Sequence, residues 1–192
     1  MRKILLILMV LLIPQVAFGG TQERILNHET NIPYTDNYDF YVDAGLCQIY
    51  PRESPRGKYL HVEYMATEKE IRKFYAELNR VSGETKGMTD KEKISYLNGY
   101  LQKTKYGTGY SALSAIVRKD AVCEGYAMAF EILSQKCGLK STVVVGGTKG
   151  GTHAWNEVEV NGKTYGVDTC WNEITKNPGS WEDHEKYFEK DF

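Results

Sequence analysis

The sequence predicts an α+β fold in which one amphipathic helix packs against an antiparallel sheet. Apolar residues recur at helical spacing between Val122 and Cys137. Further along, Asn161-Gly162 separates two apolar stretches and is typical of a type I′ hairpin turn. Two helix-capping motifs upstream, at Thr67 and Thr89, add an N-terminal portion of strands and helices.

The first 19 residues have the pattern of a signal peptide. Arg2 and Lys3 precede an apolar run at residues 4–13, and Ala17 and Gly19 are small residues suited to a signal peptidase. The run is shorter than the roughly 20 residues that a membrane span needs. We therefore expect a secreted or cell-envelope protein with no stable membrane anchor after cleavage. An uncleaved N-terminal anchor is the alternative.

Cleavage after Gly19 would leave 173 of the 192 residues, which suits a single domain with a substantial core. The remaining chain would carry 22 Lys plus Arg against 25 Asp plus Glu, a net charge of −3. The basic residues are scattered, which argues against a nucleic-acid partner. We expect a signal peptide at 1–19, an arm with strands and a helix at 20–88, and the chemistry-bearing domain at 89–192.

The N-terminal elements follow from composition and periodicity. We expect an extended arm over 21–37, a strand within 38–50, a turn over 51–57 and a returning strand over 58–65. The capping motifs predict two helices, and 111–117 predicts a short third one. The side chains expected to face the core are Ile71, Phe74, Tyr75 and Leu78 in the first helix, and Ile94, Leu97 and Leu101 in the second.

Cys123 lies in the first turn of the helix that Gly138 ends. Unpaired backbone amides and the positive end of the helix dipole favour a thiolate at such a position. Gly125 and Ala127 keep the surface beside the thiol open. These features predict a nucleophile, and the alternative is a buried structural cysteine.

The register of the hairpin can be derived from its turn. With a two-residue loop at Asn161-Gly162, Val160 faces Lys163, and His153 and Asp168 become diagonal neighbours on one face. A loop longer or shorter by one residue would separate them. The other face would be the core side, with Ala154, Val158, Val160, Tyr165 and Val167. Before the hairpin we expect a buried strand over 141–145 and a mobile glycine-rich loop over 146–151.

Cys123, His153 and Asp168 thus supply a nucleophile, a base and a group that orients the base. Trp155 and Trp171 could shield this pair of His153 and Asp168 from water, although core packing explains them equally well. The alternatives are a core or surface histidine for His153 and a turn residue for Asp168.

Four cysteines leave other arrangements open: Cys47, Cys123, Cys137 and Cys170. Two disulfides are an alternative in an exported chain, and the sequence does not decide between them and free thiols. Cys170 is a rival nucleophile, a disulfide partner or a packed thiol, but a strand offers it no helix dipole. A zinc site from Cys123, His153 and Cys170 is weakened by the lack of Cys-x-x-Cys or His-x-x-x-His spacing. We expect no metal and no cofactor.

Several segments resemble the transglutaminase-like superfamily, in particular its small exported bacterial members. They are Val122-Cys123-Glu124-Gly125-Tyr126-Ala127, His153-Ala154-Trp155-Asn156 and Tyr165-Gly166-Val167-Asp168-Thr169-Cys170-Trp171. The helix from Thr89, with Tyr106 and residues 110–113, also resembles the segment that precedes the nucleophile in that family. The resemblance implies a papain-like core in which the nucleophile helix packs on an antiparallel sheet. It also implies Cys123 as nucleophile, His153 as base and Asp168 as orienter. Residues 20–88 show no such likeness.

The resemblance implies attack on an amide carbonyl of a protein or peptide through an acyl-enzyme. Hydrolysis and cross-linking remain open, with a slight preference for hydrolysis. We expect the Cys123 backbone amide to be one oxyanion donor, and Gln102 or Tyr106 to be a second donor. Trp155 is a candidate for contact with substrate. A non-catalytic cell-envelope or protein-binding module that keeps the fold is the alternative.

Overall fold

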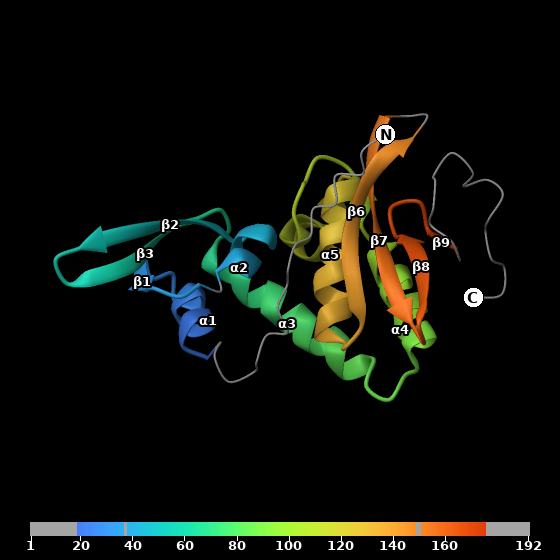
Figure 1. Ribbon diagram of the computed structural model, residues 1–192, viewed down its shortest axis with the longest axis horizontal. Coiled ribbons are helices and arrows are strands. Elements are labelled where there is room, and N and C mark those ends of the chain that lie inside the picture. The colour runs from blue at the N-terminus through green and yellow to red at the C-terminus, as the bar shows by residue number, and fades with distance from the viewer. Residues whose placement is uncertain (1–18, 37, 149–150, 176–192) are drawn as a thin grey trace.

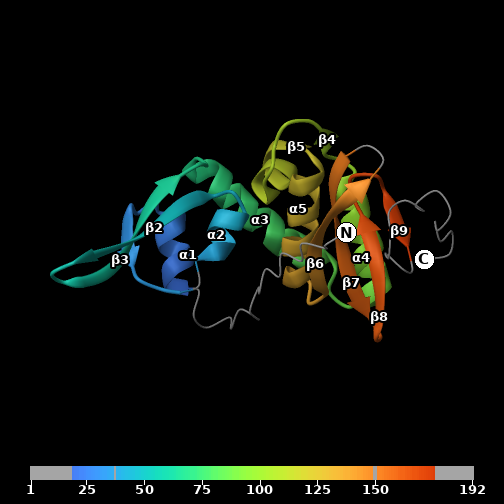
Figure 2. The same cartoon turned by 45° about the horizontal axis from the view of Figure 1, so that its top comes forward.

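The computed structural model describes residues 19–36, 38–148 and 151–175. The expected signal peptide lies outside these residues except for its last position. Figure 1 shows two lobes joined by the long helix α3 (Glu68–Glu84). The N-terminal lobe holds α1 (Gly19–Leu26), β1 (Asn31–Pro33), α2 (Asp39–Asp43), β2 (Cys47–Ser54) and β3 (Gly57–Tyr64). Figure 2 shows the β2–β3 hairpin extending away from the other lobe.

The N-terminal lobe differs in part from the expectation. Residues 21–37 contain α1 and β1 and are not a plain extended arm. Residues 38–50 hold the short helix α2 before strand β2 begins. β2 continues through Pro51 to Ser54, so the expected seven-residue turn shrinks to Pro55 and Arg56. The sheet order is β1-β3-β2, all antiparallel, and Pro51 is tolerated because β2 is an edge strand.

Both predicted capping boxes are present. At the start of α3, Thr67 accepts from the Glu70 amide and the Glu70 carboxylate accepts from the Thr67 amide. Thr89 and Glu92 make the same exchange at the start of α4 (Asp90–Leu101). The predicted core side chains of α4 are all fully buried, whereas Tyr75 of α3 is half-buried.

A compact connection leads from α4 to the helix that begins at Cys123. The two-residue strand β4 (Lys105–Tyr106) pairs in parallel with β5 (Asp120–Ala121). Between them lies η1 (Ser114–Arg118), a π-helical turn at the position of the expected short helix. Asp120 accepts hydrogen bonds from the Thr108 and Gly109 amides at 2.7 and 3.3 Å, which fixes the loop before η1.

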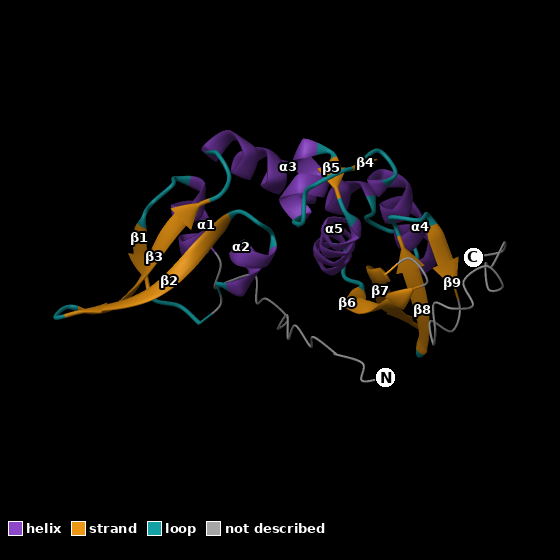
Figure 3. Ribbon diagram, turned by 90° about the horizontal axis from the view of Figure 1, so that it is seen from above, coloured by secondary structure: helices purple, strands orange, loops and turns teal. Residues whose placement is uncertain are grey.

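The C-terminal lobe has the predicted helix-on-sheet core. Helix α5 (Cys123–Lys136) lies between α3 and a four-stranded antiparallel sheet (Figure 3). The sheet order is β6 (Lys140–Thr148), β7 (Gly151–Val160), β8 (Lys163–Asp168) and β9 (Glu173–Thr175). Gly138 ends the helix with φ of 81°, as expected for a left-handed stop.

The predicted hairpin register is confirmed. Val160 pairs with Lys163, and the ladder continues to Asn156 opposite Val167. Asn161 and Gly162 both have positive φ, 51° and 73°, as a type I′ turn requires. The five residues expected on the core face are all buried: Ala154, Val158, Val160, Tyr165 and Val167.

The glycine-rich segment before β7 is the main correction in this lobe. Residues 146–148 extend β6 and Gly151 begins β7, so most of the expected mobile loop is hairpin strand. Residues 149 and 150, between the strands, lie outside the described residues. β6 itself is an edge strand, and Val145 is 44% exposed, so the strand is less buried than expected.

One hydrophobic cluster runs through both lobes, from Ile25 and Ile32 to Val158 and Val167. No helix among the described residues is long and apolar enough to cross a membrane.

Candidate active site

Short connections bring three chain segments to one end of the C-terminal lobe. Only residues 137–139 separate α5 from β6, so β6 runs back toward the start of α5. β7 then begins, and the antiparallel β8 ends, at that same end of the sheet. Cys123 is the first residue of α5, His153 the third of β7 and Asp168 the last of β8. The topology alone therefore gathers the three residues at one end.

The start of α5 differs from the starts of α3 and α4. Its N-cap residue, Val122, makes no side-chain cap hydrogen bond. The first-turn amides, with the positive end of the helix dipole, can therefore stabilise an anion at Cys123. Gly125 allows the preceding loop to lie close, because a Cβ there would come within 2.8 Å of the Gly109 carbonyl oxygen.

His153 and Asp168 form a buried pair. Nε2 of His153 lies 2.5 Å from Oδ2 of Asp168, and the two residues are only 6% and 1% exposed. The other oxygen of Asp168 accepts from the amides of Cys170 and Trp171 at 2.9 and 3.0 Å. Both oxygens of the carboxylate are therefore engaged, and Nε2 of the imidazole faces the carboxylate.

Two indole rings lie nearly parallel to the imidazole of His153. The Trp171 ring is stacked on it at 4.0 Å between centroids, and the Trp155 ring lies at 6.4 Å. Trp155 is buried over Gly146, where a Cβ would meet its ring at 2.5 Å. Trp171 is 44% exposed, so it is the ring that a bound molecule can reach.

The thiol of Cys170 is poorly suited to ionise. Burial first, and then the nearby charges of Asp168 and Cys123, raise the pKa of Cys170 to about 12. All four cysteines are free thiols in this structure.

Of the two candidates for the second oxyanion donor, Tyr106 has a largely exposed side chain. It is 68% exposed, and the electrostatic influence of Cys123 and Cys170 helps to raise the pKa of its phenol, after burial. Gln102 is used differently. Its amide nitrogen donates to the Thr169 carbonyl at 2.6 Å and to Asn98 Oδ1 at 3.3 Å. Both hydrogens of the amide are thus committed, and this geometry does not support Gln102 as an oxyanion donor.

Sequence analysis assigned no role to Asn98 and named Asn156 only within a segment that resembles the family. Asn98 donates to the side chain of Asn172 at 2.8 Å, beside the Gln102 contact. Asn156 donates to the Ala127 carbonyl at 3.0 Å, which ties β7 to α5 one turn after Cys123. Asn98 and Asn156 are polar residues on otherwise apolar faces of a helix and a strand, and this pattern could have indicated their roles.

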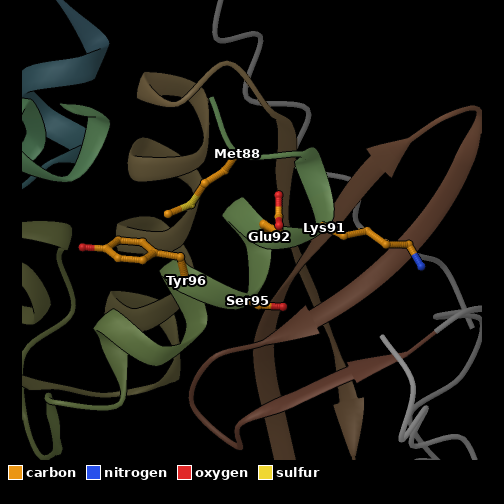
Figure 4. Close-up of a pocket in the computed structure, with 5 residues that line it drawn as sticks. All are labelled: Met88, Lys91, Glu92, Ser95 and Tyr96. Atoms are coloured by element: carbon orange, nitrogen blue, oxygen red, sulfur yellow. The ribbon is translucent and has the colours of Figure 1, made fainter. Parts of the chain in front are cut away.

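A separate concave surface lies on α4, lined by Met88, Lys91, Glu92, Ser95 and Tyr96 (Figure 4). None of the residues that surround Cys123 or His153 lines it. Among the described residues, no group of three His, Cys, Asp or Glu side chains is arranged to hold a metal ion.

Comparisons with solved structures found similar folds at low identity. A crystal structure of a TGase has a TM-score of 0.47 and 15% identity, over 72% of this chain and 48% of that one. A protein from Cytophaga hutchinsonii, named provisionally as a cysteine protease, has a TM-score of 0.40 and 12% identity, over 64% and 61%. The periplasmic domain of TgpA from Pseudomonas aeruginosa, bound to ethylmercury, has a TM-score of 0.39 and 12% identity, over 66% of each chain.

The chain thus spans about half of the TGase structure's length and 61% of the Cytophaga protein's. No curated protein matched the sequence. A comparison with protein families matched residues 78–181, more than half of the chain, to the transglutaminase-like superfamily. That match begins within α3 and includes α5 and the strands that carry His153 and Asp168. The chain belongs to the transglutaminase-like superfamily.

Proposed function

We propose that this chain is an exported cysteine enzyme that attacks an amide carbonyl of a protein or peptide through an acyl-enzyme. The observation that carries the proposal is the buried His153–Asp168 pair, at 2.5 Å, placed at the end of the sheet where the uncapped helix α5 begins with Cys123. A base with a fixed orienter next to a thiol at a helix start is the arrangement that thiol acyl transfer needs.

In the proposed reaction, the Cys123 sulfur attacks the carbonyl carbon and His153 delivers a proton to the leaving amine. Because Asp168 holds Nε2, the imidazole exchanges the proton through Nδ1. The carboxylate fixes this tautomer and stabilises the imidazolium. The Cys123 backbone amide at the start of α5 stabilises the oxyanion of the tetrahedral intermediate.

Water or a primary amine then releases the acyl group, giving hydrolysis or a cross-link. The exposed rings of Tyr106 and Trp171 offer contact area for a protein or peptide substrate beside the thiol. Cys170 is not the nucleophile in this proposal, because its raised pKa keeps it protonated at neutral pH.

The test is the pH profile of iodoacetamide alkylation, with peptide mapping to identify the modified cysteine. An ordinary thiol with a pKa of about 8.5 loses more than 100-fold in rate between pH 9 and pH 6. We expect Cys123 to lose less than about tenfold over that range, because the imidazolium stabilises its thiolate. Cys170→Ser is the control and should leave this profile unchanged.

Ordinary reactivity at Cys123, or preferential modification of Cys170, would contradict the proposal and favour a binding module. If Cys123 is reactive, labelled peptides with and without a primary amine will separate hydrolysis from cross-linking.

The proposed export rests on the signal-peptide pattern of residues 1–19. Expression of the full chain in a bacterial host, followed by N-terminal sequencing of the extracytoplasmic fraction, should find a chain that begins at Gly20. An intact N-terminus in the cytoplasm would contradict export without bearing on the thiol chemistry.

A further inference from the structure

Two amide side chains, one within α4 and one at the residue that caps its C-terminal end, hold the turn that follows Asp168. We propose that Asn98 and Gln102 are positioning residues for the His153–Asp168 pair, an inference that rests on the proposed function. They touch neither the imidazole nor the thiol in any described contact. Their effect would pass through the turn at residues 169–172, which connects β8 to β9.

The two amides engage both ends of this turn. Gln102 donates to the carbonyl of Thr169, the first residue of the turn, at 2.6 Å. Asn98 donates to Oδ1 of Asn172, the last residue of the turn, at 2.8 Å. A hydrogen bond of 3.3 Å from Gln102 to Asn98 joins the two amides. Helix α4 therefore fixes the turn at two points, with one buried residue and one at its C-terminal end.

This turn also fixes the carboxylate of Asp168 and the indole ring of Trp171. Its amides at Cys170 and Trp171 both donate to Oδ1 of Asp168, which orients Oδ2 toward His153. The Trp171 ring, carried by the same turn, is stacked on the imidazole at 4.0 Å. A shift of the turn would therefore move two of the groups that set the orientation of His153.

The turn has features that make such a support necessary. Trp171 and Asn172 are exposed, and Asn172 has a left-handed backbone with φ of 61°. Asn reaches that conformation more easily than most residues but not without cost. A catalytic group must hold its geometry within about 0.5 Å, so supports of this kind affect rate more than they affect folding.

The experiment compares four variants in the alkylation assay and in thermal unfolding. Gln102→Ala and Asn98→Ala each remove one contact with the turn and also the hydrogen bond between the two amides. Asn98→Asp keeps the acceptor for Gln102 and can receive a hydrogen bond from Asn172 after its amide flips by 180°. Lys103→Ala is the matched control, since Lys103 is the exposed neighbour of Gln102 and makes no contact with the turn in the described structure.

The quantity compared is the ratio of the Cys123 alkylation rate at pH 6 to the rate at pH 9. We expect this ratio to be lower in both alanine variants than in wild type, by roughly 10- to 100-fold. The Tm should stay within about 3 °C of wild type. Asn98→Asp should keep most of the wild-type ratio, and Lys103→Ala all of it.

A wild-type ratio in both alanine variants would overturn the inference while leaving the proposed function in place. A loss that follows the fall in Tm and that Asn98→Asp does not restore would also overturn it, because it would show a merely structural role. Ordinary thiol behaviour of wild-type Cys123 would instead overturn the proposed function, and this inference with it.

Discussion

At the scale of single residues, the carboxylate of Asp168 has hydrogen-bond partners on both of its oxygens. One of its oxygens accepts hydrogen bonds from two backbone amides of the following turn, and the other faces Nε2 of His153. It is 1% exposed, so the surroundings and not water set its hydrogen bonds. The identity of this side chain, and not only its charge, therefore decides which imidazole nitrogen carries the proton.

Asp168→Asn should preserve the turn and disable the base. The side-chain oxygen can still accept from the amides of Cys170 and Trp171, which leaves the new amide nitrogen facing His153. That nitrogen donates, so Nε2 of the imidazole must accept and the proton moves to Nδ1. A base that already carries its proton on the side of the thiol cannot activate it, and an analogous change elsewhere costs about 10⁴-fold in kcat.

In Asp168→Asn, we expect the rate of Cys123 alkylation at pH 6 to fall at least about 100-fold with little change in Tm, because the imidazolium would lose its charged partner. Glu124→Gln is the matched control, since it removes one exposed carboxylate next to Cys123 without touching the pair. Equal losses in the two variants would show that net charge, and not tautomer, governs the thiol.

At the scale of secondary-structure elements, the helices α3, α4 and α5 begin in two ways. α3 and α4 each start with a complete capping box, whereas α5 starts with Val122 and no side-chain cap. A cap at α5 would satisfy a first-turn amide that can otherwise stabilise an anion at Cys123. Stability and reactivity therefore compete for the same backbone groups at this helix start.

Val122→Thr tests this competition. Val122 has φ of −86° and ψ of 176°, a backbone suited to an N-cap, so the new hydroxyl can accept from the amide of Gly125. We expect the free energy of unfolding to rise by up to about 1 kcal/mol, while alkylation of Cys123 at pH 6 falls. Chemical denaturation and the alkylation assay measure the two effects.

Thr89→Val is the matched opposite change at α4. It should cost about 1 kcal/mol of stability without altering the reactivity of Cys123, because its capping box lies at another helix. Faster alkylation in Val122→Thr would refute the competition.

Local signals predicted the elements that bring the site together, and tertiary context decided the rest. The capping boxes, the period of α5 and the Asn161-Gly162 turn gave the correct helices and register. Helix α1 and strand β1 were not predicted, because they are short and polar and because β1 pairs with a strand almost 30 residues away. The glycines before β7 suggested a loop, but Gly146 instead makes room for the Trp155 ring within a strand.

The candidate site was predictable to the same extent. The strand register predicted that His153 lies beside Asp168, because the register depends only on the length of the hairpin loop. The role of Gln102 could not be read from the sequence, because its partner at Thr169 is 67 residues away. Local patterns carry no information on such a contact.

At the scale of the whole molecule, an acidic side chain of the N-terminal lobe affects a buried one in the C-terminal lobe. Glu131 of α5 is 5% exposed, and burial first, then the charge of Asp43 in α2, raise its pKa to about 7. A hydrogen bond from the Val143 amide acts in the opposite direction. Burial, and then Asp39, raise the pKa of Asp43 to about 6. The contact between α5 and the N-terminal lobe is therefore more favourable when these carboxyls are protonated.

The free energy of unfolding should fall as pH rises through 7. A carboxyl whose folded pKa lies above its unfolded value binds more protons in the folded state, so its contribution is complete below about 4.5 and disappears above 7. Glu131→Gln should remove that contribution. Between pH 5 and pH 8, the free energy of unfolding should therefore fall by about 2 kcal/mol less in the variant than in wild type.

Urea denaturation at the two pH values measures this difference. Ser134→Ala, a buried substitution on the same helix that removes no titratable group, is the control. The same pH dependence in wild type and Glu131→Gln would show that Glu131 ionises normally.

The turn at Asn161 and Gly162 has a practical consequence. The antiparallel hairpin that gathers His153 and Asp168 at one end of the sheet sends this exposed turn to the other, about 25 Å away along β7. A tether attached there would immobilise the protein on a bead or sensor chip with the reactive thiol facing the solution. Immobilised in this way, the protein could be used to capture and identify molecules that form the proposed acyl-enzyme with Cys123.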